Sequence, residues 1–219
     1  MPRHRNVVVV DVKTSGDDFN VLGYVPVEFA WWNLTTGARG DFLVKHNVRL
    51  VTDLGDPQAL RALRYVERGL AEQDQDLDHA ALIRLEGQLY DNTLAAVDPT
   101  RVARLLTRQY SLVPAHQRPQ WGSDFPTNEP WHSRLLDLTS FACGVLATAP
   151  DQLAGLDDIA ATLDITPADP GTAAGDVDTA GRCLLELTER SIDHRERAAR
   201  RFFLGRARRH TPTLTGATL

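Results

Sequence analysis

The sequence predicts an α/β fold in which a mixed sheet is flanked by helices. Short β-branched runs fill the first 45 residues, and apolar residues recur at helical spacing after residue 56. The order of strands first, then alternating strands and helices, suits such a sheet. The chain has 219 residues, of which 42% are hydrophobic and 24% charged, which is enough for one globular domain with a sizeable core.

Three strands are expected at the start of the chain. Residues 7–12 form a β-branched run that ends at a Thr-Ser-Gly turn, and their four consecutive valines indicate a central strand. Residues 25–34 and 41–45 predict two more strands, joined by a turn that contains glycine. We expect the three strands to be antiparallel neighbours.

The rest of the chain predicts helices with one short strand among them. An apolar stretch at residues 93–97 precedes Asp98-Pro99, and we expect Asp98 to cap the helix that follows. Apolar spacing predicts three later helices, at residues 140–148, 155–163 and 174–188.

The C-terminal segment is rich in arginine. We divide the chain into a domain over residues 1–190 and a basic helix or tail over residues 191–219, which could bind nucleic acid or form an exposed helix face.

Composition narrows the possible partners and the compartment. A formal charge of −5 argues against indiscriminate binding to nucleic acid or anionic membrane, so any such contact must be local. Cys143 and Cys183 form neither a disulfide framework nor a zinc site, and we interpret both as packing residues. The N-terminus has no signal-peptide pattern and no segment resembles a membrane span, so we expect a cytoplasmic protein without membrane contact.

Two further features predict contacts with a nucleic acid. Arg61 and Arg64 lie on one predicted helix, where arginines at i and i+3 can meet neighbouring phosphates, although nearby glutamates also fit a solvated mixed-charge face. Trp121 and Phe125 lie in a proline-rich segment, residues 113–131, that we expect to be an irregular loop. Aromatic side chains on such a loop can stack on unpaired bases.

Four short segments resemble the motifs of the DEDD family of 3′→5′ exonucleases, in its DEDDh, proofreading-type form. Asp11-Val12-Lys13-Thr14-Ser15-Gly16 is similar to the family's Asp-x-Glu-Thr-Thr-Gly, and Val-Glu-Phe-Ala around Glu28 is similar to its Ile-Glu-Ile-Ala. Val97-Asp98 is similar to the Phe-Asp of the second motif, and the segment that ends at Asp176 is similar to His-x-x-x-x-Asp. The resemblance covers roughly residues 6–190.

The resemblance implies a ribonuclease H-like fold, with a five-stranded mixed sheet whose first three strands are antiparallel. It also implies that Asp11, Asp98 and Asp176 hold Mg²⁺ or Mn²⁺ in a two-metal site that activates water against a phosphodiester. Thr14 would then contact the nucleic acid. The partner implied is single-stranded DNA or RNA, or a nucleotide.

Two positions depart from the family's pattern. Lys13 stands where the family has glutamate, and because residues i and i+2 of a strand face the same way, its ammonium would point at the metal site. The site could therefore hold no metal at all. Gly171 stands where the family has its catalytic histidine, so a general base would have to come from elsewhere, such as His132 or His116.

Three functions follow from this pattern. The first is a degenerate exonuclease, a pseudoenzyme that binds a single-stranded 3′ end or a nucleotide with weak or no cleavage, which Lys13 and Gly171 favour. The second is an active metal-dependent 3′→5′ exonuclease that uses Asp11, Asp98 and Asp176. The third is a protein-interaction or small-ligand module. Replacing Lys13 with glutamate and Gly171 with histidine is expected to raise metal affinity and activity.

Overall fold

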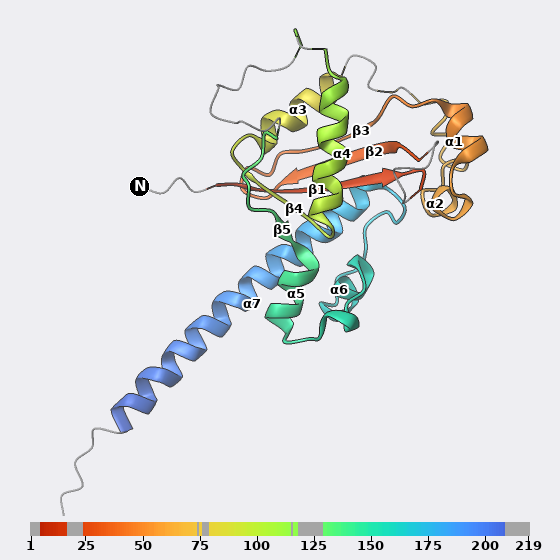
Figure 1. The fold of residues 1–219 in the computed structure, drawn as a ribbon. Coiled ribbons are helices and arrows are strands. Elements are labelled where there is room, and N and C mark those ends of the chain that lie inside the picture. The colour runs from red at the N-terminus through yellow and green to blue at the C-terminus, as the bar shows by residue number, and fades with distance from the viewer. Residues whose placement is uncertain are drawn as a thin grey trace, which may run out of the picture.

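The protein contains one five-stranded mixed sheet with helices on both faces (Figure 1). The computed structural model describes residues 5–16, 24–73, 75, 79–114, 116–117 and 129–208, without the side chains of 194 and 196–208. The strands are β1 (Val7–Thr14), β2 (Pro26–Asn33), β3 (Arg39–Leu43), β4 (Thr93–Ala96) and β5 (Leu136–Asp137).

The strand order is β3-β2-β1-β4-β5, with β1, β2 and β3 mutually antiparallel and β4 and β5 parallel to β1. This arrangement confirms the predicted fold class. It also confirms that the valine-rich first strand is central.

Seven α-helices are seen in the described part of the chain. Along the chain they are α1 (Val48–Leu54), α2 (Pro57–Ala62), α3 (Ala80–Leu89), α4 (Pro99–Leu112), α5 (Leu138–Leu146), α6 (Leu156–Thr162) and α7 (Ala173–Arg208), with a 3₁₀ turn at Pro150–Gln152. Asp98 caps α4, as predicted: its carboxylate accepts a hydrogen bond from the backbone N–H of Arg101.

Alternation along β1 divides the core into two layers. Val8, Val10 and Val12 pack under α3 and α4, whereas Val9 packs with α5, α6 and α7 on the opposite face. Because side chains alternate, Asp11 and Lys13 share the face of Val9, toward α7. Period-two packing of the valines thus directs these two charged side chains to one side of the sheet.

Helix α7 is much longer than its apolar spacing predicts, and it runs well past the edge of the sheet (Figure 1). It begins at a cap in which the Thr172 hydroxyl accepts a hydrogen bond from Gly175 N–H. Gly181 lets the helix approach β2 closely, because a Cβ there would lie 2.2 Å from the Trp32 ring. Beyond Leu187, the last buried residue among the side chains that the structure describes, charged residues replace the apolar period in the sequence. The boundary expected between residues 190 and 191 falls inside this helix.

The prediction that Arg61 and Arg64 share a helix is wrong. Helix α2 ends at Ala62. Arg64 has a φ of +54°, and a right-handed helix cannot continue through a residue with a positive φ. The chain turns here because Tyr65 and the following apolar residues are drawn into a third core; Tyr65 is 1% exposed, and its hydroxyl is 2.8 Å from a ring nitrogen of His46. The free energy gained by burying Tyr65 thus decides the local structure, although the spacing of the arginines predicts a helix.

Two of the remaining expectations concern cysteines and membrane contact. Cys143 and Cys183 are both buried in the core beside α7, in agreement with a packing function. Within the described residues, no helix has both the length and the apolar content needed to cross a bilayer.

Candidate active-site cleft

A cleft of about 640 Å³ opens at the C-terminal end of β1. Its walls come from β1, the corner between β4 and α4, the start of α6 and the first turns of α7. Among the described residues, five carboxylates and two cationic side chains line it: Asp11, Asp98, Asp157, Asp158 and Asp176 with Lys13 and Arg101. We call this site the acidic cleft.

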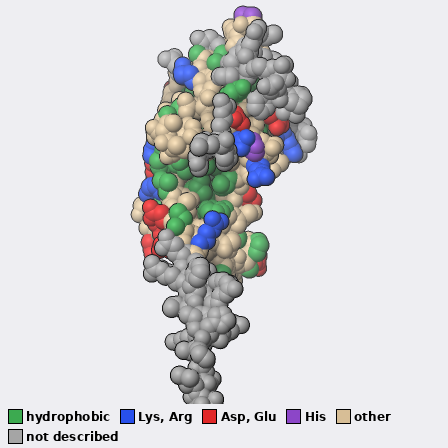
Figure 2. All heavy atoms as spheres, turned by 90° about the vertical axis from the view of Figure 1, so that its left-hand side faces the viewer, with side chains coloured by type: hydrophobic (Ala, Val, Ile, Leu, Met, Phe, Trp, Pro, Cys, Tyr) green, Lys and Arg blue, Asp and Glu red, His purple; other side chains and the backbone are tan. Residues whose placement is uncertain are grey.

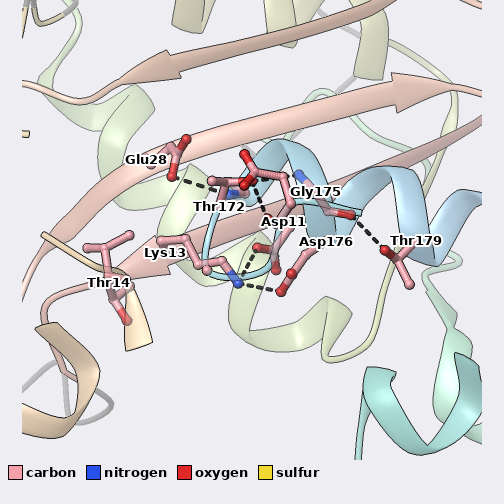
Figure 3. A network of polar contacts seen from close by, with 12 residues as sticks. Asp11, Lys13, Thr14, Glu28, Thr172, Gly175, Asp176 and Thr179 are labelled. Atoms are coloured by element: carbon pink, nitrogen blue, oxygen red, sulfur yellow. Dashed lines mark hydrogen bonds and ion pairs between the residues drawn. The ribbon is translucent and has the colours of Figure 1, made fainter. Parts of the chain in front are cut away.

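Lys13 lies between two of these carboxylates (Figure 3). Its Nζ is 3.3 Å from Asp11 Oδ2, and it donates a hydrogen bond to Asp176 Oδ2. The three side chains are only 21–30% exposed. Asp11 and Lys13 come from one side of β1 and Asp176 from the first turns of α7, so the cap of α7 fixes the geometry of the cluster.

Burial and mutual charge set the protonation of this cluster. Burial raises the pKa of Asp11, and although Lys13 opposes this, the neighbouring charge of Asp176 adds to it. Burial lowers the pKa of Lys13, but attraction to Asp11 and Asp176 outweighs burial and holds it above its ordinary value of 10.5. The ammonium is therefore fully charged at neutral pH and balances part of the acidic charge.

These residues do not fit the pair of divalent metals that the resemblance implies. The Lys13 ammonium lies between Asp11 and Asp176, two of the carboxylates that would hold a metal ion. An ammonium has no electron pair to donate to a metal ion, and its positive charge repels one. Across the described residues, no three His, Cys, Asp or Glu side chains are grouped closely enough to hold a metal ion. The three side chains form an ion-paired triad, in which the buried Asp11 Oδ2 lies beside the ammonium but accepts no hydrogen bond from any described residue.

Asp98 and Thr14 reach the same cleft from neighbouring elements. The exposed carboxylate of Asp98 is 2.9 Å from Arg101 N–H at the start of α4. The guanidinium of Arg101 donates a hydrogen bond of 2.8 Å to Oγ1 of Thr14, the last residue of β1. The structure therefore places the predicted residues Asp11, Lys13, Thr14, Asp98 and Asp176 around one cleft.

Three residues of the acidic cleft were not predicted as site residues. Arg101 follows the capping aspartate by one helical turn, and that spacing is a signal that could have identified it. Asp157 and Asp158 lie in the first turn of α6, where acidic residues are common because they complement the helix dipole. Their sequence context carries no signal that α6 packs beside α7.

Gly171 cannot carry the missing histidine without rearrangement. It has a φ of +84°, and a Cβ at this position would lie 2.5 Å from the carbonyl oxygen of Ala62. The replacement of Gly171 with histidine therefore strains the backbone and is not expected to restore a base.

The histidines proposed as substitutes lie far from the cleft. The backbone N–H of His132 bonds to Asn92 O, just before β4, and Thr93 pairs with Val7. Val7 precedes Asp11 by four residues, which is ~13 Å along a strand at ~3.3 Å per residue. His116 follows the far end of α4, ~21 Å from its cap at ~1.5 Å per residue. Among the described residues, none of those lining the acidic cleft is a histidine.

Glu28 positions the site from behind instead of lining it. Its buried carboxylate forms a two-point ion pair with Arg68, at 2.9 and 3.0 Å, and accepts a hydrogen bond from Ala173 N–H. Arg68 also donates to Gly171 O. This buried network holds the turn that starts α7, and so it places Asp176.

The other residues predicted to contact nucleic acid lie elsewhere. Arg61 is exposed on α2, and Arg64 pairs with Glu67 and Asp169, at 3.5 and 3.8 Å, outside the acidic cleft. Trp121 and Phe125 are outside the described residues.

Solved 3′-exonucleases share this fold. The nuclease domain of 3′hExo, a DEDDh family member bound to rAMP, is 10% identical and aligns over 86% of this chain and 94% of its own, with a TM-score of 0.59. A 3′-exonuclease described for 3′-end specific recognition of a histone mRNA stem-loop is 11% identical over 86% of this chain and 84% of its own, with a TM-score of 0.60.

Product-bound exonuclease I is 15% identical over 87% of this chain, with a TM-score of 0.59, but the match spans only 45% of that protein. No protein-family model and no curated protein sequence matches the chain. The chain therefore has the fold of the DEDDh 3′-exonucleases, as the sequence motifs predicted.

Proposed function

We propose that this protein binds the 3′ end of a single-stranded nucleic acid, or a nucleotide, in the acidic cleft with weak or no cleavage. The observation that carries the proposal is the ammonium of Lys13, which pairs with both Asp11 and Asp176 on an exonuclease fold. With the Lys13 ammonium in place of a metal ion, the acidic cleft can still bind a ligand, but it lacks the divalent ion that would activate water.

Two physical arguments support the absence of efficient cleavage. A divalent ion would have to displace Lys13 from two carboxylates, which costs the ion pairs and leaves an ammonium beside the metal. The cleft also lacks a histidine among its described residues, and loss of a general base typically costs about 10²–10⁴ in rate.

The charges in the cleft favour a terminal nucleoside over a cluster of phosphates. Among the described residues that line it, five carboxylates outnumber two cationic side chains, so the interior repels several phosphates at once. Carboxylates accept hydrogen bonds from sugar hydroxyls, whereas Lys13 and Arg101 can each meet one phosphate. The binding of rAMP by the nuclease domain of 3′hExo supports this assignment.

Asp157 and Asp158 favour a second candidate, a metal-dependent 3′→5′ exonuclease. These carboxylates line the same cleft as Asp11 and Asp176, and they could replace the missing glutamate if Lys13 left its position. In that case the protein would bind Mg²⁺ or Mn²⁺ and shorten a strand from its 3′ end.

One experiment separates the two candidates. The intact protein is titrated with Mn²⁺ and Mg²⁺ by calorimetry, and then incubated in the same buffer with 5′-labelled single-stranded DNA and RNA. We expect no metal binding and no shortening, together with binding of AMP that Asp11→Ala alters. Tight metal binding with stepwise shortening that Asp11→Ala abolishes would establish the exonuclease instead.

A further inference from the structure

A row of arginines leads away from the acidic cleft along α4. Arg101, Arg104 and Arg108 are spaced at i, i+3 and i+7, which places them on one side of the helix. The row covers ~10 Å of the helix axis at ~1.5 Å per residue. The sequence of α4 contains no acidic residue that could neutralise them from within the helix.

The outer two arginines border a second groove. It has a volume of about 520 Å³ and lies between α4 and residues 129–135, with Arg104, Arg108 and Thr107 on the helix side. Glu129 is the one acidic residue among the described residues that line it. The groove is therefore cationic on balance, in contrast to the acidic cleft.

Arg104 and Arg108 are exposed, and neither forms an ion pair with any described residue. By comparison, Arg39, Arg64 and Arg68 are each paired with a carboxylate. Two uncompensated guanidinium groups on one helix side are suited to anions that recur along a chain, as phosphates do.

The two hollows adjoin at the start of α4. Arg101 and Asp98 line the acidic cleft, whereas Thr100 and Arg104, within one turn of them, line the second groove. Helix α4 lies on the opposite face of the sheet from α7 (Figure 1), so the row leads away from the cluster that contains Asp176.

The net charge of the protein argues that this basic feature is local. Figure 2 shows one face of the molecule, on which Lys and Arg side chains are scattered among acidic ones around a hydrophobic area. With a formal net charge of −5, the protein has no general attraction for nucleic acid.

We propose that Arg104 and Arg108 bind the backbone phosphates of a single strand whose 3′-terminal nucleoside lies in the acidic cleft. This inference rests on the proposed function and adds a second contact surface to it. The strand would enter along the groove beside α4, with Arg101 at the junction. The ligand class is then a single-stranded oligonucleotide in preference to a mononucleotide.

The test compares Arg104→Glu/Arg108→Glu with Arg49→Glu/Arg84→Glu. The control pair makes the same change in net charge at exposed arginines on α1 and α3 that line none of the pockets described above. Binding of 5′-labelled oligothymidylate is measured by fluorescence anisotropy over a range of salt, and binding of AMP by calorimetry. Circular dichroism checks that each variant is folded, and Arg104→Ala/Arg108→Ala provides a milder second variant.

We expect the α4 variant to weaken oligonucleotide binding at least tenfold relative to the control pair. The slope of log affinity against log salt should fall by about 1.4, because each single-strand phosphate contact contributes about 0.7. AMP binding should stay unchanged, since a mononucleotide reaches only the cleft.

Equal oligonucleotide binding by the α4 and control variants would overturn the inference while AMP binding still upheld the proposed function. If the wild type bound neither oligonucleotide nor AMP, both the proposed function and the inference would be overturned.

Discussion

Replacing Lys13 with alanine tests whether the ammonium holds the acidic cleft together. The change leaves Asp11 and Asp176 without their shared partner, so two partly buried carboxylates repel each other. Breaking a buried ion pair costs about 3–5 kcal/mol, and breaking an exposed one about 0–1 kcal/mol. With side chains that are 21–30% exposed, this cluster lies between those limits. We therefore expect the free energy of unfolding to fall by about 1–3 kcal/mol at pH 7.

The assay is urea unfolding of the wild type, Lys13→Ala and Lys45→Ala. Lys45 is the matched control, because it is the only other lysine in the sequence and its side chain is exposed. Its removal should change the free energy of unfolding by less than about 0.5 kcal/mol.

A second measurement adds Mn²⁺ to each protein. The vacated position in Lys13→Ala is flanked by two carboxylates, so Mn²⁺ should stabilise this variant, by about 2.7 kcal/mol at one hundred times the dissociation constant. The wild type should not respond. If Lys13→Ala were as stable as Lys45→Ala and equally indifferent to Mn²⁺, the ammonium would not be the cation that balances Asp11 and Asp176.

Three further predictions concern pH, a glycine and a buried ion pair. Because the pKa of Lys13 is raised in the folded state, this lysine stabilises the fold fully below pH 10.5, and the stabilisation is lost as pH rises through the higher folded-state pKa. Urea unfolding on both sides of pH 10.5 should therefore show a steeper loss of stability for the wild type than for Lys13→Ala. Gly171→Ala and Gly37→Ala should each lower the free energy of unfolding by about 1–2 kcal/mol, because both positions have a positive φ. Thermal unfolding should show the larger loss for Gly171→Ala, since of the two positions only Gly171 has backbone where a Cβ would lie. Equal losses would contradict this close contact. Arg68→Ala should lower the free energy of unfolding by about 3–5 kcal/mol, because it leaves the buried Glu28 carboxylate without its ion-pair partner. Arg39→Ala removes an exposed ion pair and should lower it by about 1 kcal/mol. Similar losses for the two variants in urea unfolding would argue against the buried network.

The parts of the fold that sequence predicts are those set by local period and by caps. The valines of β1 face two different cores, and a run of that kind suits only a central strand. Asp98 followed by proline marks the start of α4 for a local reason, a side chain that accepts from the third residue of the helix. These features need no knowledge of distant contacts.

The parts that sequence misses depend on tertiary packing. The turn after α2 forms because Tyr65 is buried, although helical spacing there predicts a helix. In the site, alternation along β1 predicts that Asp11 and Lys13 face the same way, as they do. Asp157 and Asp158 reach the cleft only because α6 packs beside α7, and nothing in their own sequence expresses that contact.

A cation carried on the same strand as Asp11 makes the positive charge between the two carboxylates independent of the concentration of free metal ions. The occupancy of a metal site follows mass action and falls when free ions become scarce. The ammonium of Lys13 is tethered, so its effective concentration at the two carboxylates is fixed by the chain. Chelators and metal starvation should leave the cleft unchanged, and the one solution variable that can discharge its cation is the proton concentration.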